Sequence, residues 1–372
     1  VCQRTTPSPG LSAAPHCLAT MANASPQVFK TPITEMFGIV HPVILAGMNV
    51  AAGPKLAAAV TNAGGLGVIG GVGYTPRMLR AQLRRLKADL VDKSAPFGVD
   101  LLLPQVGGGA RKTNTDYTGG KLAELIDIVI ESGARLFVSA VGVPPKWVVE
   151  KLHAANIPVM NMVGAPKHVP KALAAGVDLI CAQGGEGGGH TGDVATSILI
   201  PACVDACRGK RSPLTGQPVH VIAAGGISDG RGLAMALCFG AQAVWVGTRF
   251  VAATEAGAPP RHKDAVVGAD FHDTVRTIIF TGRPMRVLRN EYITNWETER
   301  AAEIRDLTSR GIVPVQKDIE MAEKAKDTVD PKAVATLRPL LMGQVAARIT
   351  DVQPAKKIID DMVADAAVAL AG

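Results

Sequence analysis

From residue 43 onward, hydrophobic positions fall in short apolar runs that alternate with longer stretches of helical spacing, at a repeat of roughly 25–35 residues. The apolar runs are continuous instead of alternating with polar residues, which is typical of strands buried on both faces in a parallel sheet. The predicted strands are Val43–Met48, Gly67–Gly71, Phe97–Leu103, Leu136–Val141, Pro158–Val163, Asp178–Ala182, His220–Ala224 and Ala243–Gly247. The predicted helices between them are Pro54–Asn62, Pro76–Leu90, Lys121–Ser132, Pro144–Ala155, Pro166–Ala175, Ser197–Cys207 and Asp229–Phe239.

Strands that alternate with helices in this way predict an α/β fold, a (β/α)8 barrel of the TIM type. A doubly wound open sheet is the rival arrangement of the same elements. Residues 251–345 depart from this alternation of strands and helices, with mixed helical patterns and an apolar run at Val275–Phe280. We interpret them as a helical excursion after strand eight. The helix Pro354–Leu370 then supplies the missing eighth outer helix.

The first 30 residues differ from the rest of the chain. Residues 1–29 contain no acidic residue and one arginine, and they are rich in Ser, Thr, Pro and Ala. Such a composition offers little apolar surface to offset the entropy of ordering, so we expect residues 1–30 to be a disordered leader. Met21 is the natural start that the sequence suggests, and the signal for an organellar targeting peptide is weak. Residues 31–372 then form the barrel together with the excursion.

Composition and charge limit the classes of function. Hydrophobic residues make up 47% of the chain and charged residues 19%, so the core is ample. The net charge of +7 is spread out, and its densest cluster has helical spacing without interleaved aromatic residues, which favours a solvated helix face over a nucleic-acid site. No apolar run reaches the roughly 18 residues of a membrane span. The basic cluster consists of Arg77, Arg80, Arg84, Arg85 and Lys87.

The six cysteines show no spacing typical of a disulfide framework. Four of them fall in predicted core elements, which favours free thiols in a reducing compartment and hence a cytoplasmic protein. Cys203 and Cys207 have the i, i+4 spacing of a metal pair, but buried small hydrophobic residues explain them better in the absence of a second ligand pair. We therefore predict no metal site. The sequence does not indicate an oligomeric state.

The glycine-rich run Gln183–Gly192 follows the sixth predicted strand directly. Six glycines in ten residues weaken any regular element and let backbone amides approach a ligand closely. Among the eight histidines, His190 alone follows a strand end, where barrel enzymes carry their active sites. A flexible surface loop with an incidental histidine is the alternative. Glu186 is either an orienting partner of His190 or a solvent-exposed or capping carboxylate.

Two further glycine motifs follow the last two predicted strands. Gly225 and Gly226 end strand seven, and Gly247 and Thr248 end strand eight, where barrel enzymes usually bind phosphate. Glycines at these positions let N–H groups point at a phosphate, and the following helix N-terminus adds partial positive charge. Together the two motifs predict a phosphorylated cofactor.

The remaining strand ends carry small residues and amides. The segment Ala46-Gly47-Met48 follows the first strand and leaves room for a flat ring. Asp100 ends strand three, and Asn161 and Gln183 offer amide donors and acceptors at strands five and six. Ordinary turn chemistry explains any one of these residues equally well.

Four of these segments resemble motifs of the nitronate monooxygenase (2-nitropropane dioxygenase) family, over about residues 31–372. The motifs are Val43–Met48, Asn62–Gly67, Gln183–His190, and Ala224–Ile227 with Gly230-Arg231-Gly232. The resemblance implies an FMN-dependent barrel enzyme in which His190 is the catalytic base. It implies that Ala46, Gly47 and Met48 line the flavin ring and that FMN contacts Gln183, Gly188, Gly225, Gly226, Gly247 and Thr248.

The chain departs from the family pattern at three points. Relatives often have Ala-Pro-Met in place of Ala46-Gly47-Met48, Asn in place of Asp100, and Ala in place of Gly187. A carboxylate at Asp100 would accept hydrogen bonds without donating them, so we expect the flavin contact there to differ. The departures affect the expected substrate more than the expected cofactor.

The resemblance implies an enzyme that oxidises nitronates, and as a wider activity nitroalkanes, to carbonyl compounds and nitrite with O2. Three rivals are open. An FMN-dependent enoyl-thioester reductase would oxidise NAD(P)H. An enzyme similar to inosine-monophosphate dehydrogenase would need a cysteine after strand six, and residues 183–196 contain none. A non-catalytic flavin- or phosphate-binding barrel would bind its ligand without turnover.

Overall fold

The computed structural model describes residues 25–324 and 338–372. Eight parallel strands form one sheet in the order β1-β9-β8-β6-β5-β4-β3-β2, and Ile44 in β1 forms a bridge with Leu66 just before β2. The two edges of the sheet therefore meet, which confirms the predicted barrel. The strands are β1 (Val43–Leu45), β2 (Gly67–Gly71), β3 (Phe97–Leu102), β4 (Leu136–Ala140), β5 (Val159–Val163), β6 (Leu179–Gln183), β8 (His220–Ala224) and β9 (Ala243–Val246).

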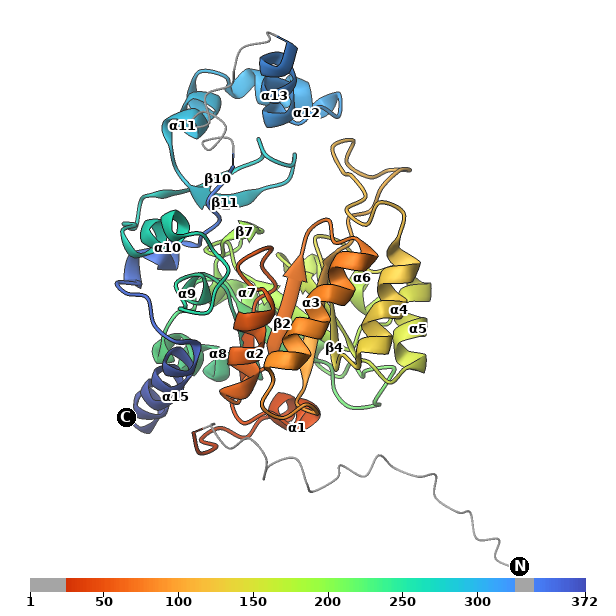
Figure 1. The fold of residues 1–372 in the computed structure, drawn as a ribbon, viewed down its shortest axis with the longest axis vertical. Helices are drawn as coiled ribbons and strands as arrows, with labels where there is room; N and C mark the ends of the chain where they lie inside the picture. Colours follow the sequence, from red (N-terminus) through yellow and green to blue (C-terminus); the bar gives the residue numbers. More distant parts are fainter. Residues whose placement is uncertain (1–24, 325–337) are drawn as a thin grey trace, which may run out of the picture.

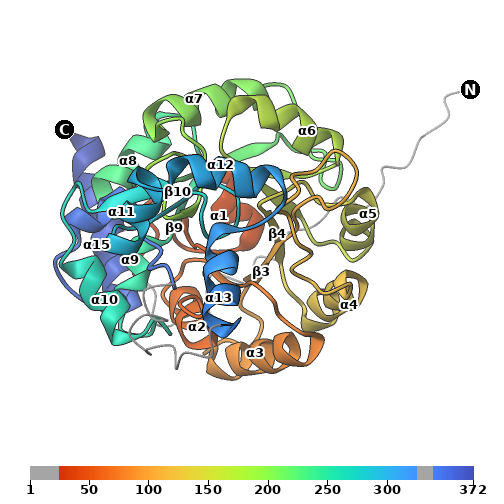
Figure 2. The ribbon, with the colours of Figure 1, turned by 90° about the horizontal axis from the view of Figure 1, so that it is seen from above.

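A ring of helices surrounds the barrel (Figure 2). Each predicted outer helix is present, and the last one, α15, packs between α8 and α2 and so completes the ring. The outer helices are α2 (Pro54–Asn62), α3 (Pro76–Asp89), α4 (Leu122–Ser132), α5 (Lys146–Ala154), α6 (Val169–Ala174, preceded by the 3-10 turn η1, Pro166–His168), α7 (Thr196–Cys207), α8 (Gly230–Cys238) and α15 (Ala355–Ala371). The basic cluster lies on α3, where Arg80 pairs with Glu131 of α4.

Successive residues of each strand face different cores, although the strands read as continuous apolar runs. In β1, Ile44 belongs to the cluster inside the barrel, whereas Val43 and Leu45 belong to the cluster between strands and helices. A short helix that the sequence pattern did not predict, α1 (Pro32–Phe37), contributes Ile33 and Phe37 to the inner cluster. In Figure 2 α1 lies at the centre of the ring.

The excursion has a hydrophobic core of its own and is not purely helical. It contains the antiparallel hairpin β10 (Thr274–Thr277) and β11 (Met285–Leu288), and the predicted apolar run 275–280 forms part of that hairpin. Its core is built around Trp296, which is fully buried. Figure 1 shows this region above the strand ends. The short helix α9 (Thr248–Val251) follows β9 directly and leads into the excursion. The helices of the excursion are α10 (Pro260–Val267), α11 (Glu291–Thr298), α12 (Ala301–Ser309) and α13 (Pro314–Lys324), followed by the 3-10 turn η2 (Gln344–Arg348).

Two boundaries differ from the sequence-based expectation. Strand β1 ends at Leu45, because residues 46–48 leave the ladder and line a cavity. Ser25 donates to Asp360 at 2.6 Å and the Gln27 side chain donates to the Val40 carbonyl at 3.4 Å, so residues 25–30 lie with the barrel and not with the predicted leader. The proposed start at Met21 lies outside the described residues.

The cysteines and the described helices bear on two further expectations. Cys181, Cys203 and Cys207 are buried free thiols, as predicted, whereas Cys238 is free but exposed on α8. Burial raises the pKa of the Cys203 thiol to about 12 and of the Cys207 thiol to about 11, so both behave as small hydrophobic side chains. Within the described residues, no helix is long and apolar enough to cross a membrane.

Candidate active site

A cavity of about 1690 Å³ opens at the carboxyl ends of the barrel strands, beneath the excursion. Every residue that the sequence predicts for the site lines this one cavity. The residues are Ala46, Gly47, Met48, Asp100, Asn161, Gln183, Gly188, His190, Gly225, Gly226, Gly247 and Thr248. The barrel topology brings them together because parallel strands end at the same edge. Their individual roles stay predictions.

The loop that carries His190 is held from both sides. Gly189 and His190 form a short strand, β7, that pairs with β11 of the excursion, with Met285 opposite His190. From the barrel side, the Gln183 side-chain amide donates to the carbonyl of His190 at 3.0 Å and to that of Gly188 at 3.3 Å. The glycine run is therefore an ordered loop fixed between barrel and excursion, and not a flexible surface loop.

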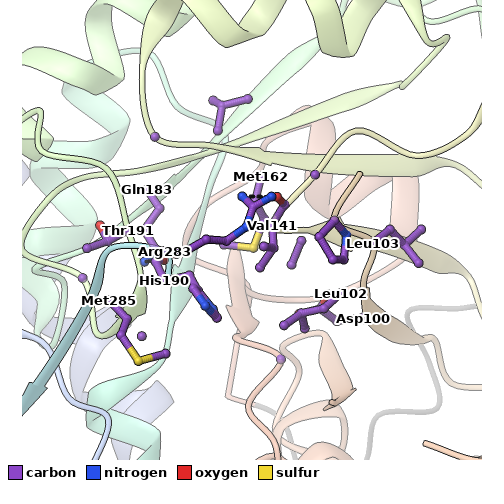
Figure 3. Close-up of a pocket in the computed structure, with 18 of the residues that line it drawn as sticks. Asp100, Leu102, Leu103, Val141, Met162, Gln183, His190, Thr191, Arg283 and Met285 are labelled. Atoms are coloured by element: carbon purple, nitrogen blue, oxygen red, sulfur yellow. Dashed lines mark hydrogen bonds between the residues drawn. The ribbon is translucent and has the colours of Figure 1, made fainter. Parts of the chain in front are cut away.

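The His190 ring has a partner that sequence reasoning did not find. Its Nε2 lies 3.0 Å from Oγ1 of Thr281 in the excursion. Burial, and to a lesser extent the Arg283 cation, lowers the pKa of His190 to about 4. The imidazole is therefore neutral at neutral pH. Figure 3 shows His190, Arg283 and Met285 on one side of the cavity and Asp100, Leu102 and Leu103 on the other.

Glu186 is a cap and not the partner of His190. Its two carboxylate oxygens accept from the backbone N–H of Thr196 at 3.1 and 3.0 Å, and one also accepts from the Thr196 hydroxyl at 2.9 Å. Thr196 is the first residue of α7, so Glu186 satisfies a donor at the start of that helix. Of the two readings of Glu186 that the sequence left open, the capping role is confirmed.

The ends of β8 and β9 form a cradle of free backbone donors. Gly225 and Gly226 have φ values of 90° and 71°, which favour glycine. Gly226 is exposed to the cavity, and no acceptor in the described part of the chain takes its N–H. The Thr248 hydroxyl accepts from the N–H of Gly343 at 2.9 Å, which ties the end of the excursion to this cradle. A phosphate would meet uncommitted N–H groups here.

Asp100 lies at the opposite part of the cavity, and one of its oxygens has no hydrogen-bond partner in the part of the chain that the structure describes. It is 2% exposed, and its Oδ1 contacts no donor or acceptor in the described residues. Burial raises the pKa of this carboxyl to about 8. Contrary to the expectation of a carboxylate, Asp100 is therefore protonated at neutral pH, because the low-polarity surroundings disfavour its charge, and it is able to donate a hydrogen bond.

Only one of the two polar side-chain atoms of Asn161 has a partner in the described residues. Its Nδ2 donates to the carbonyls of Ser139 at 2.9 Å and Gly142 at 2.7 Å, which fixes the turn after β4. Its Oδ1 is buried and has no partner among the described residues. Buried polar atoms are normally satisfied, so the unpaired oxygens of Asp100 and Asn161 indicate that a ligand completes this site.

The excursion adds a wall that the strand periodicity could not indicate. Arg283 donates to the carbonyl of Val141 at 2.9 Å and to the Asn114 side chain at 2.9 Å, so it spans from the excursion to the barrel loops. Arg276 also lines the cavity, and its buried Nε has no partner among the described residues. These positively charged side chains come from residues about 90 positions away from His190 in the chain, and no motif marks them.

The residues present fit a flavin mononucleotide. The glycine cradle suits its phosphate, the unpaired polar atoms of Asp100 and Asn161 suit a heteroaromatic ring, and the cavity exceeds the roughly 300–1,000 Å³ of an ordinary single-ligand pocket. The described residues hold no group of three or more His, Cys, Asp or Glu side chains arranged to bind a metal ion.

Comparison with known proteins agrees with this site. A sequence model of the nitronate monooxygenase family matches residues 30–365. The chain is 35% identical to (3aS,4S,5R,7aS)-5-hydroxy-7a-methyl-1-oxo-octahydro-1H-indene-4-carboxyl-CoA dehydrogenase of Mycobacterium tuberculosis, over 91% of this chain and 96% of that protein.

Two solved structures share the whole architecture. FabK from Thermotoga maritima superposes with a TM-score of 0.73 at 30% identity, covering 92% of this chain and 98% of that chain. Nitroalkane oxidase from Streptomyces ansochromogenes superposes with a TM-score of 0.74 at 25% identity, covering 91% and 99%. With the family match along nearly the whole barrel and excursion, the chain belongs to the nitronate monooxygenase family of flavin-dependent oxidoreductases.

Proposed function

We propose that this oxidoreductase binds FMN and oxidises nitronates to carbonyl compounds and nitrite with O2, and turns over neutral nitroalkanes more slowly. The observation that carries the proposal is the group His190, Thr281 and Arg283 within the cavity at the strand ends. It places a neutral imidazole and a guanidinium cation on the same wall. A small anion bound there would be attracted by the cation.

Each part of the cavity has a distinct role in this proposal. Gly226 and Gly247 offer backbone donors to the FMN phosphate, and Ala46-Gly47-Met48 lies along the ring. A bound flavin would accept the electron pair of the substrate and pass it to O2. In this proposal Arg283 holds the substrate against the flavin ring. The unprotonated ring nitrogen of His190 accepts a proton from the substrate.

The low pKa of His190 favours the nitronate over the neutral nitroalkane as the substrate. At neutral pH the ring is unprotonated and available as a base. A base whose conjugate acid has a pKa of about 4 is weak, and general bases work best when their pKa lies near the working pH. Removal of the α-proton of a nitroalkane is therefore slow, whereas a nitronate has already lost that proton. The nitronate is the better substrate.

The test combines a spectrum with one substitution. The purified protein should be yellow with a flavin spectrum, and it should release nitrite from a nitronate. His190→Asn removes the base at similar polar volume and should keep FMN bound. Turnover of a neutral nitroalkane should fall by roughly 10²-fold, the low end of the contribution of a general base, because a base of low pKa is weak. Nitronate turnover should fall much less.

The matched control is His168→Asn, because His168 lines the same cavity from the η1 turn but lies apart from the His190–Thr281 contact. It should leave the ratio of the two substrate rates unchanged. Equal losses on both substrates in the His190 variant would contradict the role as base, and absence of nitrite release from any nitronate would contradict the proposed reaction.

A second candidate is oxidation or reduction of an acyl or enoyl thioester, and the size and the lining of the cavity favour it. Its volume of about 1690 Å³ leaves room beyond a flavin for more than a small nitronate. Basic side chains line the same cavity on the α6 side, and the pKa of His168 is lowered by burial and by the neighbouring Lys167 and Lys171. They suit the phosphates of a coenzyme A thioester, the substrate type in the name of the mycobacterial relative.

Flavin reduction under anaerobic conditions separates the two candidates. A nitronate that bleaches the flavin spectrum supports the first function. Bleaching by an acyl-CoA, or by NAD(P)H with re-oxidation by an enoyl thioester, supports the second. A protein that binds FMN but responds to none of these would be the non-catalytic barrel.

A further inference from the structure

Asp100 combines three properties that rarely occur together. It is 2% exposed, it lines the cavity, and its Oδ1 has no protein partner in the described residues. A buried polar group without a partner destabilises the folded state, so native proteins seldom keep one without a reason. The carboxyl is therefore placed for a ligand and not for the protein's own packing.

Gly47 lies directly against this carboxyl. A β-carbon placed on Gly47 would lie 2.6 Å from Cβ and 2.8 Å from Cγ of Asp100, and its contact with Oδ2 would be closer still. Real β-carbons essentially never approach other atoms that closely. The Asp100 carboxyl therefore occupies the space that any other residue at position 47 would need.

Within residues 25–324 and 338–372, no cation offsets the burial of Asp100. The titratable group coupled to it is Cys181 on β6, a strand that does not pair with β3, and burial raises the pKa of that thiol well above its ordinary value, so Cys181 is neutral as well. Asp100 pairs with Gly70 on β2 and Val138 on β4, and Gly47, just after β1, lies against its side chain; none of the three brings a charge. Burial alone sets the protonation state of Asp100.

We infer that Asp100 is a neutral carboxylic acid that donates its proton in a hydrogen bond to an acceptor on the flavin ring, and that Gly47 lacks a side chain in order to admit it. The inference rests on the FMN site of the proposed function. It assigns Asp100 a role in binding the cofactor, which can be tested without turnover.

The main experiment measures the FMN dissociation constant from pH 6.5 to 9.5 by quenching of flavin fluorescence. Wild-type affinity should be constant up to about pH 8 and then weaken about tenfold for each pH unit, because ionisation removes the donor. Asp100→Asn keeps a neutral donor of similar shape, so its affinity should match the wild type at pH 7 and lack the loss above pH 8. Asp100→Ala should bind FMN more weakly at every pH.

Two outcomes overturn the inference. One is a wild-type affinity that stays constant through pH 9.5, and the other is an equal loss in Asp100→Asn, which would assign the loss to the flavin itself. Failure of every variant and of the wild type to bind FMN would overturn the proposed function together with this inference. Constant binding across the pH range would overturn only the inference.

A second measurement does not involve FMN. An acid whose pKa is raised on folding holds a proton that the unfolded chain has lost, so it makes unfolding easier as pH rises from about 4 to about 8. Relative to Asp100→Asn, the folded-to-unfolded ratio of wild type should fall across this window by up to tenfold per pH unit and stay level above it. Urea unfolding at several pH values measures this. A difference that stays constant with pH would show that Asp100 is ionised in the folded protein.

The Gly47 contact gives a paired test. Gly47→Ala should lower the melting temperature and the FMN affinity, because its β-carbon meets the Asp100 side chain. Adding Asp100→Gly should restore the melting temperature and not the affinity. Gly53→Ala is the matched control, because a β-carbon there meets only the Val50 carbonyl at an ordinary 3.5 Å. A Gly47→Ala variant as stable as this control would contradict the steric pairing.

Discussion

The two walls of the cavity differ in origin and in chemistry. The barrel wall consists of strand ends with small or neutral residues, such as Gly47, Gly226 and Gly247. The excursion wall carries Thr281 and Arg283 and brings charge and hydrogen-bonding groups to His190. We interpret the barrel wall as the cofactor side and the excursion wall as the substrate side. Relatives that share the barrel can therefore act on different substrates if their excursions differ.

His190 belongs to both walls. It follows barrel strand β6, yet its short strand β7 pairs with β11 of the excursion. The barrel sets the position of the His190 ring. The excursion provides its electrostatic surroundings and its hydrogen-bond partner Thr281. Substitutions on the barrel wall should therefore affect cofactor binding first, and substitutions on the excursion wall should affect turnover and its pH dependence first.

The largest effect is expected at Gly247. Its φ is −109°, and a β-carbon would contact Ala46 and Met48 at an ordinary 3.5–3.6 Å, so the fold tolerates a side chain here. Gly247→Leu would fill the cradle and block approach of a phosphate to the backbone N–H groups. Charge-assisted hydrogen bonds contribute about 1.5–3 kcal/mol each, so loss of two should weaken FMN binding by at least about a hundredfold.

The measurement is the flavin content of the purified protein together with its circular dichroism spectrum. Gly109→Leu is the matched control, because a β-carbon there meets nothing within 4 Å and the residue lies outside the cavity. It should keep both flavin and fold. A folded Gly247→Leu protein with full flavin content would show that the phosphate binds elsewhere, and the assignment of the two walls would fail.

The barrel wall could be predicted from the sequence because its signals are local. Each strand is a short apolar run, and the residue that follows it must lie at one edge, so His190 and Gly226 could be placed in one site before any coordinates. The excursion wall has no such rule. Thr281 meets His190 only because the hairpin pairs with β7, a contact across 91 positions that no periodicity encodes.

The protonation state of Asp100 could not be predicted from the sequence either. Asp100 follows a strand like any polar residue, and its burial becomes visible only when β2 and β4 surround it. Glu186 had two readings until the position of Thr196 showed which helix it caps. Short α1 escaped prediction because six residues give too little of a helical period, although Pro32 and the Thr31 cap mark its start.

An intermediate effect is expected at Thr281. Thr281→Val keeps the shape of the side chain and removes the hydroxyl that contacts His190 Nε2 at 3.0 Å. A single hydrogen bond contributes about 0.5–1.5 kcal/mol, so kcat should fall about 2- to 12-fold while FMN affinity stays unchanged. Thr281→Ser keeps the hydroxyl and should keep most of the activity. If Thr281→Val instead lost FMN, the excursion wall would be part of the cofactor site.

The smallest effect, and the sharpest distinction between the walls, is a shift in pH dependence at Arg283. The Arg283 cation is the second cause of the low His190 pKa, after burial. Arg283→Gln removes the charge, so the pKa should rise above its value of about 4 and yet remain below the ordinary 6.5, because burial persists. His190 acts as a base only when unprotonated, so activity is lost as pH falls through this pKa. The acid limb of kcat/KM for a neutral nitroalkane should therefore move to higher pH. Arg283→Lys keeps the charge and should leave the limb in place, and an unmoved or lowered limb in Arg283→Gln would show that the excursion wall does not tune His190.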